Sequence, residues 1–420
     1  MTEQALFQAK LLIHARAILP GALKKTISGE HSDNLPAMPD FPQGAVDVSS
    51  AEDLKRVVQS ASSARELAVD AEADALHAFR PRLCFVQIAT DREVFLLDTL
   101  VPEVRLSELG AAFAEAEKAK YFHAAAGDLQ YLAERGLRVR GLFDTHRAVT
   151  LLGWPKVGLA DLARERLQVE LPKEHQQADF SIRPLPEELR RYIADDVRYL
   201  CELGRQIREE CRKADILEEV ELDCRRLEDE ALSRPEIGTE YRVKLSRPGL
   251  SASERALGTA VALRLHQLRL KWAEAADVPF GRMLSNAAIG ELASNPPENM
   301  RQLAKTPHVR GKLVREHGEE LLAAIAELLA RWRKGELRVE VPEAKRMDSA
   351  QRRRGEALRA FRAAKAAERK VTPSVVLSNP LVSDLARSPP RNLDALARVP
   401  YLGEKRLRLY GRDILRILGG

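Results

Sequence analysis

The sequence predicts an α/β domain with a mixed sheet, followed by two smaller all-α domains. Three observations support this prediction. Short runs of β-forming residues alternate with helical stretches from about residue 46 onward, which is the layout of an α/β domain. Beyond about residue 186 the pattern is almost entirely helical, and this helical part contains an internal repeat. The chain of 420 residues is also too long for one ordinary domain.

The α/β part has a predictable order of elements. Three consecutive segments have the composition and length of strands: ELAVDAE (66–72), RLCFVQIAT (82–90) and EVFLLDT (93–99). Helices are predicted over 104–118 and 127–136, and KYFHAAA (120–126) is predicted as a strand that leads into a helix. This succession is typical of a mixed sheet with helices packed on it.

The internal repeat emerges when the helical half is shifted on itself by 93 residues. Leucine, proline and glycine residues then match without a gap: Leu284-Ser285-Asn286 with Leu377-Ser378-Asn379, Pro296-Pro297 with Pro389-Pro390, Leu303 with Leu396, Pro307 with Pro400, and Gly318 with Gly411. Chance rarely aligns so many prolines and glycines in one register. The repeat therefore predicts two copies of one small helical domain.

These patterns divide the chain into six segments. They are an N-terminal extension and linker (1–45), the α/β domain (46–205), a helical connector (206–249), the first helical copy (250–335), a charged linker (336–351) and the second copy (352–420). The basic first 28 residues allow two interpretations. One is a transit-like amphipathic segment. The other is a helix packed on the α/β domain, or extra residues from a translation start assigned too far upstream. We favour the second.

Charge is distributed unevenly along the chain. The net charge is +5, but residues 1–250 carry −8 and residues 251–420 carry +13, of which 341–420 contribute +10. Surface charge that merely keeps a protein soluble has no reason to segregate by domain. The asymmetry instead suggests carboxylates that bind metal in one half and a surface that binds a polyanion in the other.

Cysteine usage and hydropathy indicate the cell compartment. Cys84, Cys201, Cys211 and Cys224 show neither metal-finger spacing nor a CxxC motif. We expect reduced thiols and a cytoplasmic protein. No apolar run reaches the roughly 18 residues that a membrane span requires, so we expect no membrane partner.

Three acidic motifs carry the candidate chemistry. Asp70 and Glu72 alternate along one predicted strand, so both side chains point to the same face. Two adjacent carboxylates repel each other unless a cation lies between them. Asp128 falls in the first turn of a predicted helix, and Tyr192 and Asp196, four residues apart, share one helix face. Each motif alone has an ordinary structural explanation, such as a helix N-terminus for Asp128.

Taken together, the motifs resemble the signature of the DEDD exonuclease superfamily, in its tyrosine branch. The order is DxE, then HxxxxDL, then YxxxD. The sequence between them is similar to that of ribonuclease D. The segments with counterparts in that family are RLCFVQIAT, FLLDTL, FDTHRA, VGLADLARERLQVEL and ADFSIRPLPEELRRYIADDVRYL. The helical copies resemble HRDC domains through LRLKWAEAADVPFGRMLSNAAIGELA and HGEELLAAI. The resemblance spans about residues 46–420 and implies a ribonuclease H-like fold for the α/β domain.

The resemblance implies a metal-dependent 3′→5′ exoribonuclease. Such an enzyme trims structured RNA, usually tRNA precursors, and releases nucleoside 5′-monophosphates by means of two divalent cations, Mg²⁺ or Mn²⁺. By the same resemblance, Asp70 would bridge both cations, Glu72 and Asp196 would hold the one that carries the attacking water, and Asp128 would support the other. Tyr192 would orient the water rather than act as a strong base, because an unperturbed tyrosine has a pKa of about 10.

One departure from the family pattern is visible. Where the family usually has Asp-Trp before Arg-Pro-Leu, this chain has Asp179-Phe180 followed by Ser-Ile-Arg-Pro-Leu. Phenylalanine keeps the aromatic ring but lacks the indole donor. The change puts local substrate contacts in question, not the metal site. The second helical copy also lacks the Lys271-Trp272 pair of the first.

The basic half is expected to hold RNA by phosphate contacts, which carry little sequence information. The candidate contacts are Lys271, Arg301, Lys305, Arg310 and Lys312 in the first copy and Arg352, Arg353, Arg354, Lys405, Arg406 and Arg408 around the second. Each could instead be an ordinary solvated charge.

Two other functions fit parts of the pattern. A DNA 3′→5′ exonuclease would use the same acids, but the chain shows no polymerase or helicase motor motif. A catalytically silent RNA-binding scaffold would have lost one of the five key residues, and all five are present. We expect a monomer that acts on RNA with a single-stranded 3′ end.

Overall fold

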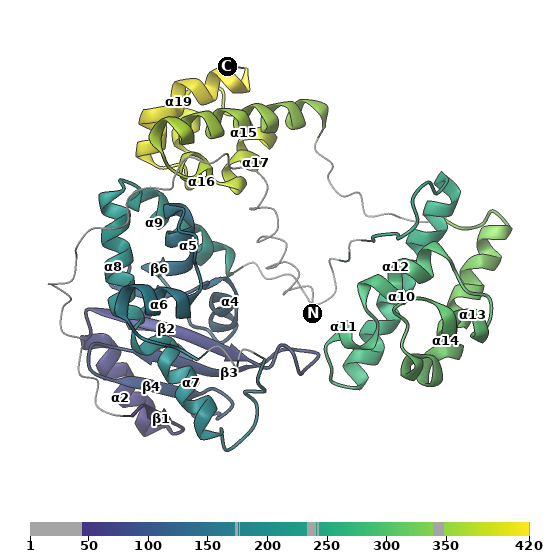
Figure 1. The fold of residues 1–420 in the computed structure, drawn as a ribbon, viewed down its shortest axis with the longest axis horizontal. Helices are drawn as coiled ribbons and strands as arrows, with labels where there is room; N and C mark the ends of the chain where they lie inside the picture. Colours follow the sequence, from purple (N-terminus) through teal and green to yellow (C-terminus); the bar gives the residue numbers. More distant parts are fainter. Residues whose placement is uncertain are drawn as a thin grey trace. The chain divides into compact units, whose positions relative to one another are not determined.

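The structure, a computed structural model, describes residues 44–172, 175, 177–232, 241, 243–338 and 348–419. These residues divide into two compact units (Figure 1). One consists of residues 243–338, and the other combines 44–241 with 348–419. The predicted N-terminal extension and most of the predicted charged linker lie outside the described residues.

The α/β domain contains a six-stranded mixed sheet, as predicted, in the order β1-β4-β3-β2-β5-β6. The strands are β1 Val46–Val48, β2 Glu66–Ala73, β3 Leu83–Ala89, β4 Val94–Asp98, β5 Ala119–Phe122 and β6 Leu142–Asp144. The β2–β3 and β3–β4 pairs are antiparallel, and the β1–β4, β2–β5 and β5–β6 pairs are parallel. Strand β3 is buried along its whole length, which explains why all of its residues except Gln87 are apolar.

Helices cover this sheet and continue beyond it. They are α2 Ala51–Ser63, α3 Gly110–Ala114, α4 Ala126–Glu134, α5 Thr145–Leu152, α6 Leu159–Leu167, α7 Glu187–Arg198, α8 Leu200–Lys213 and α9 Leu217–Glu230. Helix α7 packs on β2, β3 and β4, whereas α8 packs on β2 and β5 and α9 on β6. Helix α2 starts at an N-cap, since the Ser50 side chain accepts a hydrogen bond from the Asp53 backbone.

One predicted helix is much shorter than expected. In place of a helix over 104–118, the structure has a 3₁₀ turn at Leu106–Leu109 and helix α3, which ends at Ala114. Glu115 takes an extended conformation. The Lys118 side chain then donates to the carbonyls of Ala61 and Ser62 at the end of α2. This buried anchor turns the chain into β5, and helical composition alone does not reveal it.

The two helical copies share their register. The first contains α10 Ala252–Ala275, α11 Phe280–Met283, α12 Asn286–Ser294, α13 Met300–Lys305 and α14 Gly311–Arg333. The second contains α15 Ser349–Arg369, α16 Pro373–Val376, α17 Asn379–Arg387, α18 Leu393–Ala397 and α19 Glu404–Leu418. The last four helices of each copy start 93 residues apart. Polar N-caps begin α13 and α18 at Asn299 and Asn392, which are also 93 residues apart.

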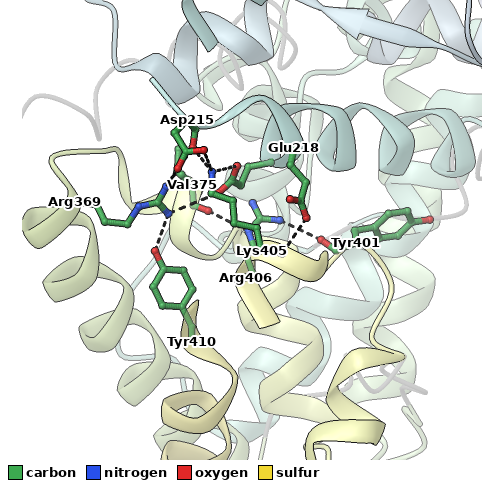
Figure 2. Close-up of polar contacts among 9 residues, drawn as sticks. Asp215, Glu218, Arg369, Val375, Tyr401, Lys405, Arg406 and Tyr410 are labelled. Carbon is green, nitrogen blue, oxygen red and sulfur yellow. Dashed lines mark hydrogen bonds and ion pairs between the residues drawn. The ribbon is translucent and has the colours of Figure 1, made fainter. Parts of the chain in front are cut away.

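The second copy docks on helix α9 of the α/β domain. Lys405 Nζ lies 2.9 Å from Asp215 Oδ1 and 3.3 Å from Glu219 Oε2 (Figure 2). Arg369 Nη1 approaches the same Glu219 at 3.6 Å. Val375 of α16 belongs to the hydrophobic core of the α/β domain. The docking contact therefore combines buried ion pairs with apolar packing.

Candidate active site

Strand β2 supplies two of the predicted acids. Its residues 67–69 are buried, and Asp70 and Glu72 follow as half-buried residues. Antiparallel pairing places Asp70 opposite Gln87 and Glu72 opposite Phe85 of β3. The alternation of side chains along the strand then directs both carboxylates to one face of the sheet.

Helix α7 supplies the third acid and the tyrosine. Because α7 packs across β2, β3 and β4, Asp196 reaches the β2 acids. One carboxylate oxygen from each of Asp70, Glu72 and Asp196 lies within 4.8 Å of the others. The neighbouring Asp195 instead pairs with Arg198 at 3.0 Å.

The fourth acid, Asp128, lies in the first turn of α4. It is not part of the group within 4.8 Å. Its charge nevertheless acts on the group. The charge of Asp128 raises the pKa of Glu72, and the charge of Asp70 in turn raises the pKa of Asp128. All four acids therefore share one electrostatic environment.

Asp144, which the sequence analysis did not single out, supports Asp128. Its buried carboxylate accepts hydrogen bonds from the backbone N–H groups of Ala124 at 3.0 Å and Ala125 at 3.1 Å. Ala124 has a φ of 65°, a left-handed conformation that costs a non-glycine residue free energy. These two bonds hold the start of α4, and therefore Asp128, in place. The segment FDTHRA, which contains Asp144 and resembles ribonuclease D, was the one feature of the sequence that pointed to this residue.

Burial and mutual repulsion dominate the electrostatics of the four acids. Burial raises the pKa of Asp70 to about 6. It also raises the pKa values of Glu72, Asp128 and Asp196 well above their usual range, and neighbouring carboxylates add to each shift. Carboxylates in this situation gain strongly from a cation among them.

The residues present fit a divalent-metal centre. Three carboxylate oxygens converge within 4.8 Å, and hard cations such as Mg²⁺ and Mn²⁺ prefer such oxygen ligands. The four cysteines are buried and free, and their thiol pKa values are raised, chiefly by burial. They therefore offer no thiolate at neutral pH.

Tyr192 is held beside the acids by aromatic neighbours. Its ring stacks on Phe180 at a centroid distance of 6.5 Å and an interplanar angle of 19°, and meets His175 edge-on at 5.6 Å. Burial raises the pKa of Tyr192, and the charges of Asp196 and Glu72 raise it further. The hydroxyl therefore stays protonated at neutral pH. Phe180, the departure from the family pattern, contacts the tyrosine itself.

Comparison with known proteins places this geometry in a family. A model described as 3′-5′ exonuclease matches residues 46–212, and one described as HRDC domain matches residues 259–325 and 351–418. Ribonuclease D of Gluconacetobacter diazotrophicus is 32% identical over 289 residues, which cover 68% of this chain and 72% of that protein. The chain belongs to the ribonuclease D family.

Two further ribonuclease D proteins match almost the whole chain. That of Granulibacter bethesdensis is 27% identical and the match covers 90% of this chain and 94% of that protein. The crystal structure of Escherichia coli RNase D, described as an exoribonuclease involved in structured RNA processing, shares the fold with a TM-score of 0.60. It is 19% identical, and the match covers 90% of this chain and 99% of that one. The family makes this chain a hydrolytic 3′→5′ exoribonuclease with divalent-metal dependence.

The predicted RNA-contacting residues lie in three environments of this ribonuclease D fold. The exposed ones are Lys271, Arg301, Lys305, Arg310, Lys312, Arg352, Arg353 and Arg408. Arg354 is half-buried and donates to the Ala386 carbonyl.

Lys405 and Arg406 are buried, with 8% and 1% of their surface exposed. Lys405 pairs with Asp215, which precedes α9, and with Glu219 of α9. Arg406 donates to the carbonyls of Val375 and Tyr401 (Figure 2). Both side chains are buried and bonded to protein groups, although Arg406 Nη2 has no hydrogen-bond partner in the part of the chain that the structure describes, so we no longer propose either as an RNA contact. No helix among the described residues is long and apolar enough to span a membrane.

Proposed function

We propose that this ribonuclease D trims the 3′ ends of structured RNA, with tRNA precursors as the substrate class, and uses two Mg²⁺ or Mn²⁺ ions. The observation that carries the proposal is the convergence of Asp70, Glu72 and Asp196 within 4.8 Å, with Asp128 electrostatically coupled to them. Free, buried cysteines support a cytoplasmic enzyme. We also propose that it acts as a monomer.

Each acid has a proposed role at the metal centre. Asp70, Glu72 and Asp196 would hold the metal directly, and Asp128 would support the centre from α4. Bound divalent ions supply charge neutralisation at the scissile phosphate and an activated water. Phosphodiester hydrolysis adds negative charge to a group that is already negative, so four carboxylates alone would oppose it.

Tyr192 is proposed to position the attacking water as a hydrogen-bond donor. Burial and the charge of the nearby Asp196 raise the pKa of its hydroxyl, which keeps the proton on oxygen. A protonated phenol can orient a water but cannot remove its proton. The stacked ring of Phe180 supports this orientation.

The decisive experiment is a digest of a 3′-extended tRNA with and without Mg²⁺ or Mn²⁺, in which the wild type is compared with Asp70→Asn. The wild type is expected to release nucleoside 5′-monophosphates only with metal. Asp70→Asn is expected to lose hydrolysis while it still binds RNA. Full activity of the variant would refute the proposed centre.

Matched RNA and DNA oligonucleotides separate the RNA proposal from its nearest alternative. Acidic side chains do not distinguish a 2′-hydroxyl, so the preference must be measured directly. Faster release of mononucleotides from RNA supports the proposal, whereas faster release from DNA contradicts it. Metal-dependent release from either one excludes a catalytically silent scaffold.

A further inference from the structure

Strand β3 carries one polar residue, Gln87, among six apolar ones. The Gln87 side chain is fully buried. Within the part of the chain that the structure describes, neither its amide nitrogen nor its amide oxygen has a hydrogen-bond partner. A buried amide without partners destabilises a fold, and native proteins satisfy nearly all such groups. The presence of this one therefore requires an explanation.

The sheet register places Gln87 beside Asp70. The two residues pair directly in the antiparallel ladder between β3 and β2. Residues opposite each other in such a pair point to the same face of the sheet, with Cβ atoms about 4.5–5.5 Å apart. Helix α7, which carries Asp196, packs across β2, β3 and β4 (Figure 1). The Gln87 side chain is therefore long enough to reach the Asp70 carboxylate beneath this helix.

The other sheet residues on this face leave the amide no free acceptor. On the β4 side, Gln87 lies opposite Leu96, and its neighbours along β3 are apolar. Asp98, a diagonal neighbour on β4, already accepts from the Arg183 guanidinium with both of its oxygens. Among the described residues of the sheet, the acceptors that remain within reach on this face are the β2 carboxylates.

An amide is a suitable donor to a carboxylate that binds metal. A lysine or arginine in the place of Gln87 would compete with a cation, because its positive charge would neutralise Asp70. A neutral amide leaves the negative charge available and still fixes the orientation of the carboxylate. Carboxylates that bind metals are themselves held by hydrogen bonds from neighbouring groups.

We propose that Gln87 is a positioning residue, whose Nε2 group donates to the Asp70 carboxylate and holds it in the orientation that binds the divalent ions. The inference rests on the metal centre proposed above. Since Gln87 has no exposed surface, it does not touch the RNA and acts only through Asp70. Loss of the donor should therefore weaken metal binding and leave RNA binding unchanged.

Two substitutions separate the amide from the space that it fills. Gln87→Met keeps an unbranched side chain of similar length and removes the amide, whereas Gln87→Asn keeps the amide on a shorter side chain. Leu96→Met is the matched control, because Leu96 is the partner of Gln87 on β4 and is only 1% exposed. Gln87→Leu replaces Gln87→Met if the methionine variant does not fold.

Calorimetric titration of the full chain with Mn²⁺ measures the metal affinity. Gln87→Met is expected to bind Mn²⁺ about 10–100-fold more weakly than the wild type, the usual effect of losing a group that orients a metal ligand. Gln87→Asn should bind Mn²⁺ more tightly than Gln87→Met, and Leu96→Met should bind it like the wild type.

The Tm in EDTA distinguishes a positioning role from a structural one. The Tm of Gln87→Met in EDTA should equal or exceed that of the wild type, because the variant no longer buries an amide without partners. A purely structural residue would give the opposite result, a lower Tm with unchanged Mn²⁺ affinity.

Hydrolysis of a single-stranded oligoadenylate gives a second readout. Gln87→Met is expected to need more Mn²⁺ for its half-maximal rate. At saturating Mn²⁺ its kcat should approach that of the wild type, and its KM for RNA should be unchanged throughout.

Equal Mn²⁺ affinity of Gln87→Met and the wild type would overturn the proposal. Equal affinity of Gln87→Met and Gln87→Asn would also overturn it, because the amide would then not be the group that matters. Asp70→Asn separates these outcomes from failure of the metal centre. If the wild type does not bind Mn²⁺, or if Asp70→Asn binds it equally well, the centre itself is wrong. If only Asp70→Asn loses binding, the role of Gln87 alone is refuted.

Discussion

At the residue scale, the chemistry depends on carboxyl groups that repel one another in the absence of metal. Asp70 has a pKa raised to about 6 by burial, and Glu72, Asp128 and Asp196 shift in the same direction. A group whose pKa is higher in the folded state stabilises the fold only while it is protonated, so this contribution is lost as the pH rises through about 6. The metal-free site is therefore a source of instability at neutral pH.

Divalent ions should thus stabilise the protein more at pH 8 than at pH 5.5. At the higher pH the carboxylates are ionised and bind the cation without first releasing protons. A hundredfold excess of ion over Kd contributes about 2.7 kcal/mol to the free energy of unfolding. Thermal unfolding with Mn²⁺ or with EDTA measures the effect at both pH values. An equal rise in Tm at both would contradict the assignment of these acids as ligands.

Tyr192→Phe should lower kcat strongly while metal affinity remains close to that of the wild type. The variant keeps the ring that stacks on Phe180 and removes only the hydroxyl. Loss of one positioning donor costs about a hundredfold to a thousandfold in rate. Single-turnover hydrolysis and a calorimetric Mn²⁺ titration measure the two quantities. An unchanged rate would remove Tyr192 from the mechanism.

At the element scale, the site depends on how α4 begins. Ala124 adopts its left-handed conformation beside Asp144, which accepts from the two backbone N–H groups that precede α4 and also caps α5 through the Arg147 N–H. One buried carboxylate thus fixes the ends of two helices. The position of Asp128 is set by this arrangement rather than by its own contacts.

Asp144→Asn should raise the metal concentration needed for half-maximal activity and lower kcat. The amide can accept with its oxygen, but its NH₂ group would face a backbone donor, an unsatisfied arrangement that costs about 1–3 kcal/mol. Asp91→Asn, at an exposed position on the β3–β4 turn, is the control. If Asp144→Asn lowers only the Tm and leaves the metal titration unchanged, Asp144 is structural and does not position Asp128.

Much of the fold and most of the acid cluster could be predicted from local patterns. Strands β2, β3 and β4 have strongly apolar sequences, and the DxE and YxxxD spacings fix which side chains share a face. The three-residue strands β1 and β6 lie below the length at which such patterns carry information. Asp144 was missed because its role consists of backbone hydrogen bonds, which leave no periodicity in the sequence.

Lys312 and Lys405 show a different limit. They occupy the same position of the repeat, yet one is exposed and the other is buried against Glu219. A basic residue in a nucleic-acid-binding module predicts a phosphate contact only while it faces solvent. Sequence equivalence fixes the position of a side chain within its domain, but not the neighbour that the domain meets.

At the scale of the whole molecule, the second helical copy is part of the α/β domain's structure. Its Lys405 and Arg369 lie against Glu219, which is fully buried. Truncation near residue 345 would expose this acid and the apolar surface of the α/β domain that Val375 covers. The truncated chain should therefore lose stability in the α/β domain, so weakened RNA binding by it would not prove that the second copy binds RNA.

Gly403→Ala tests the docking contact without truncation. A Cβ there would lie 2.4 Å from Leu222 Cδ1 and 2.6 Å from Glu218 Oε1, at a φ of +81°. Gly419→Ala is the control for a positive φ alone, since it has a φ of +90° and nothing within 4 Å, but its ψ is 26° whereas that of Gly403 is 159°. The control should cost about 1–2 kcal/mol from backbone strain, and Gly403→Ala should cost about 1–3 kcal/mol more from the clash and from its glycine-only conformation. Equal losses in chemical denaturation would show that the contact is not tight.

The close approach at Gly403 also has an evolutionary consequence. Duplicated modules usually diverge freely, but here a position in the last module is constrained by the shape of a helix near the middle of the chain. Relatives that carry a side chain at this position should have lost bulk at the counterparts of Leu222 and Glu218. The two positions are therefore expected to covary across the family, and the equivalent position in the first module, Arg310, should vary independently of them.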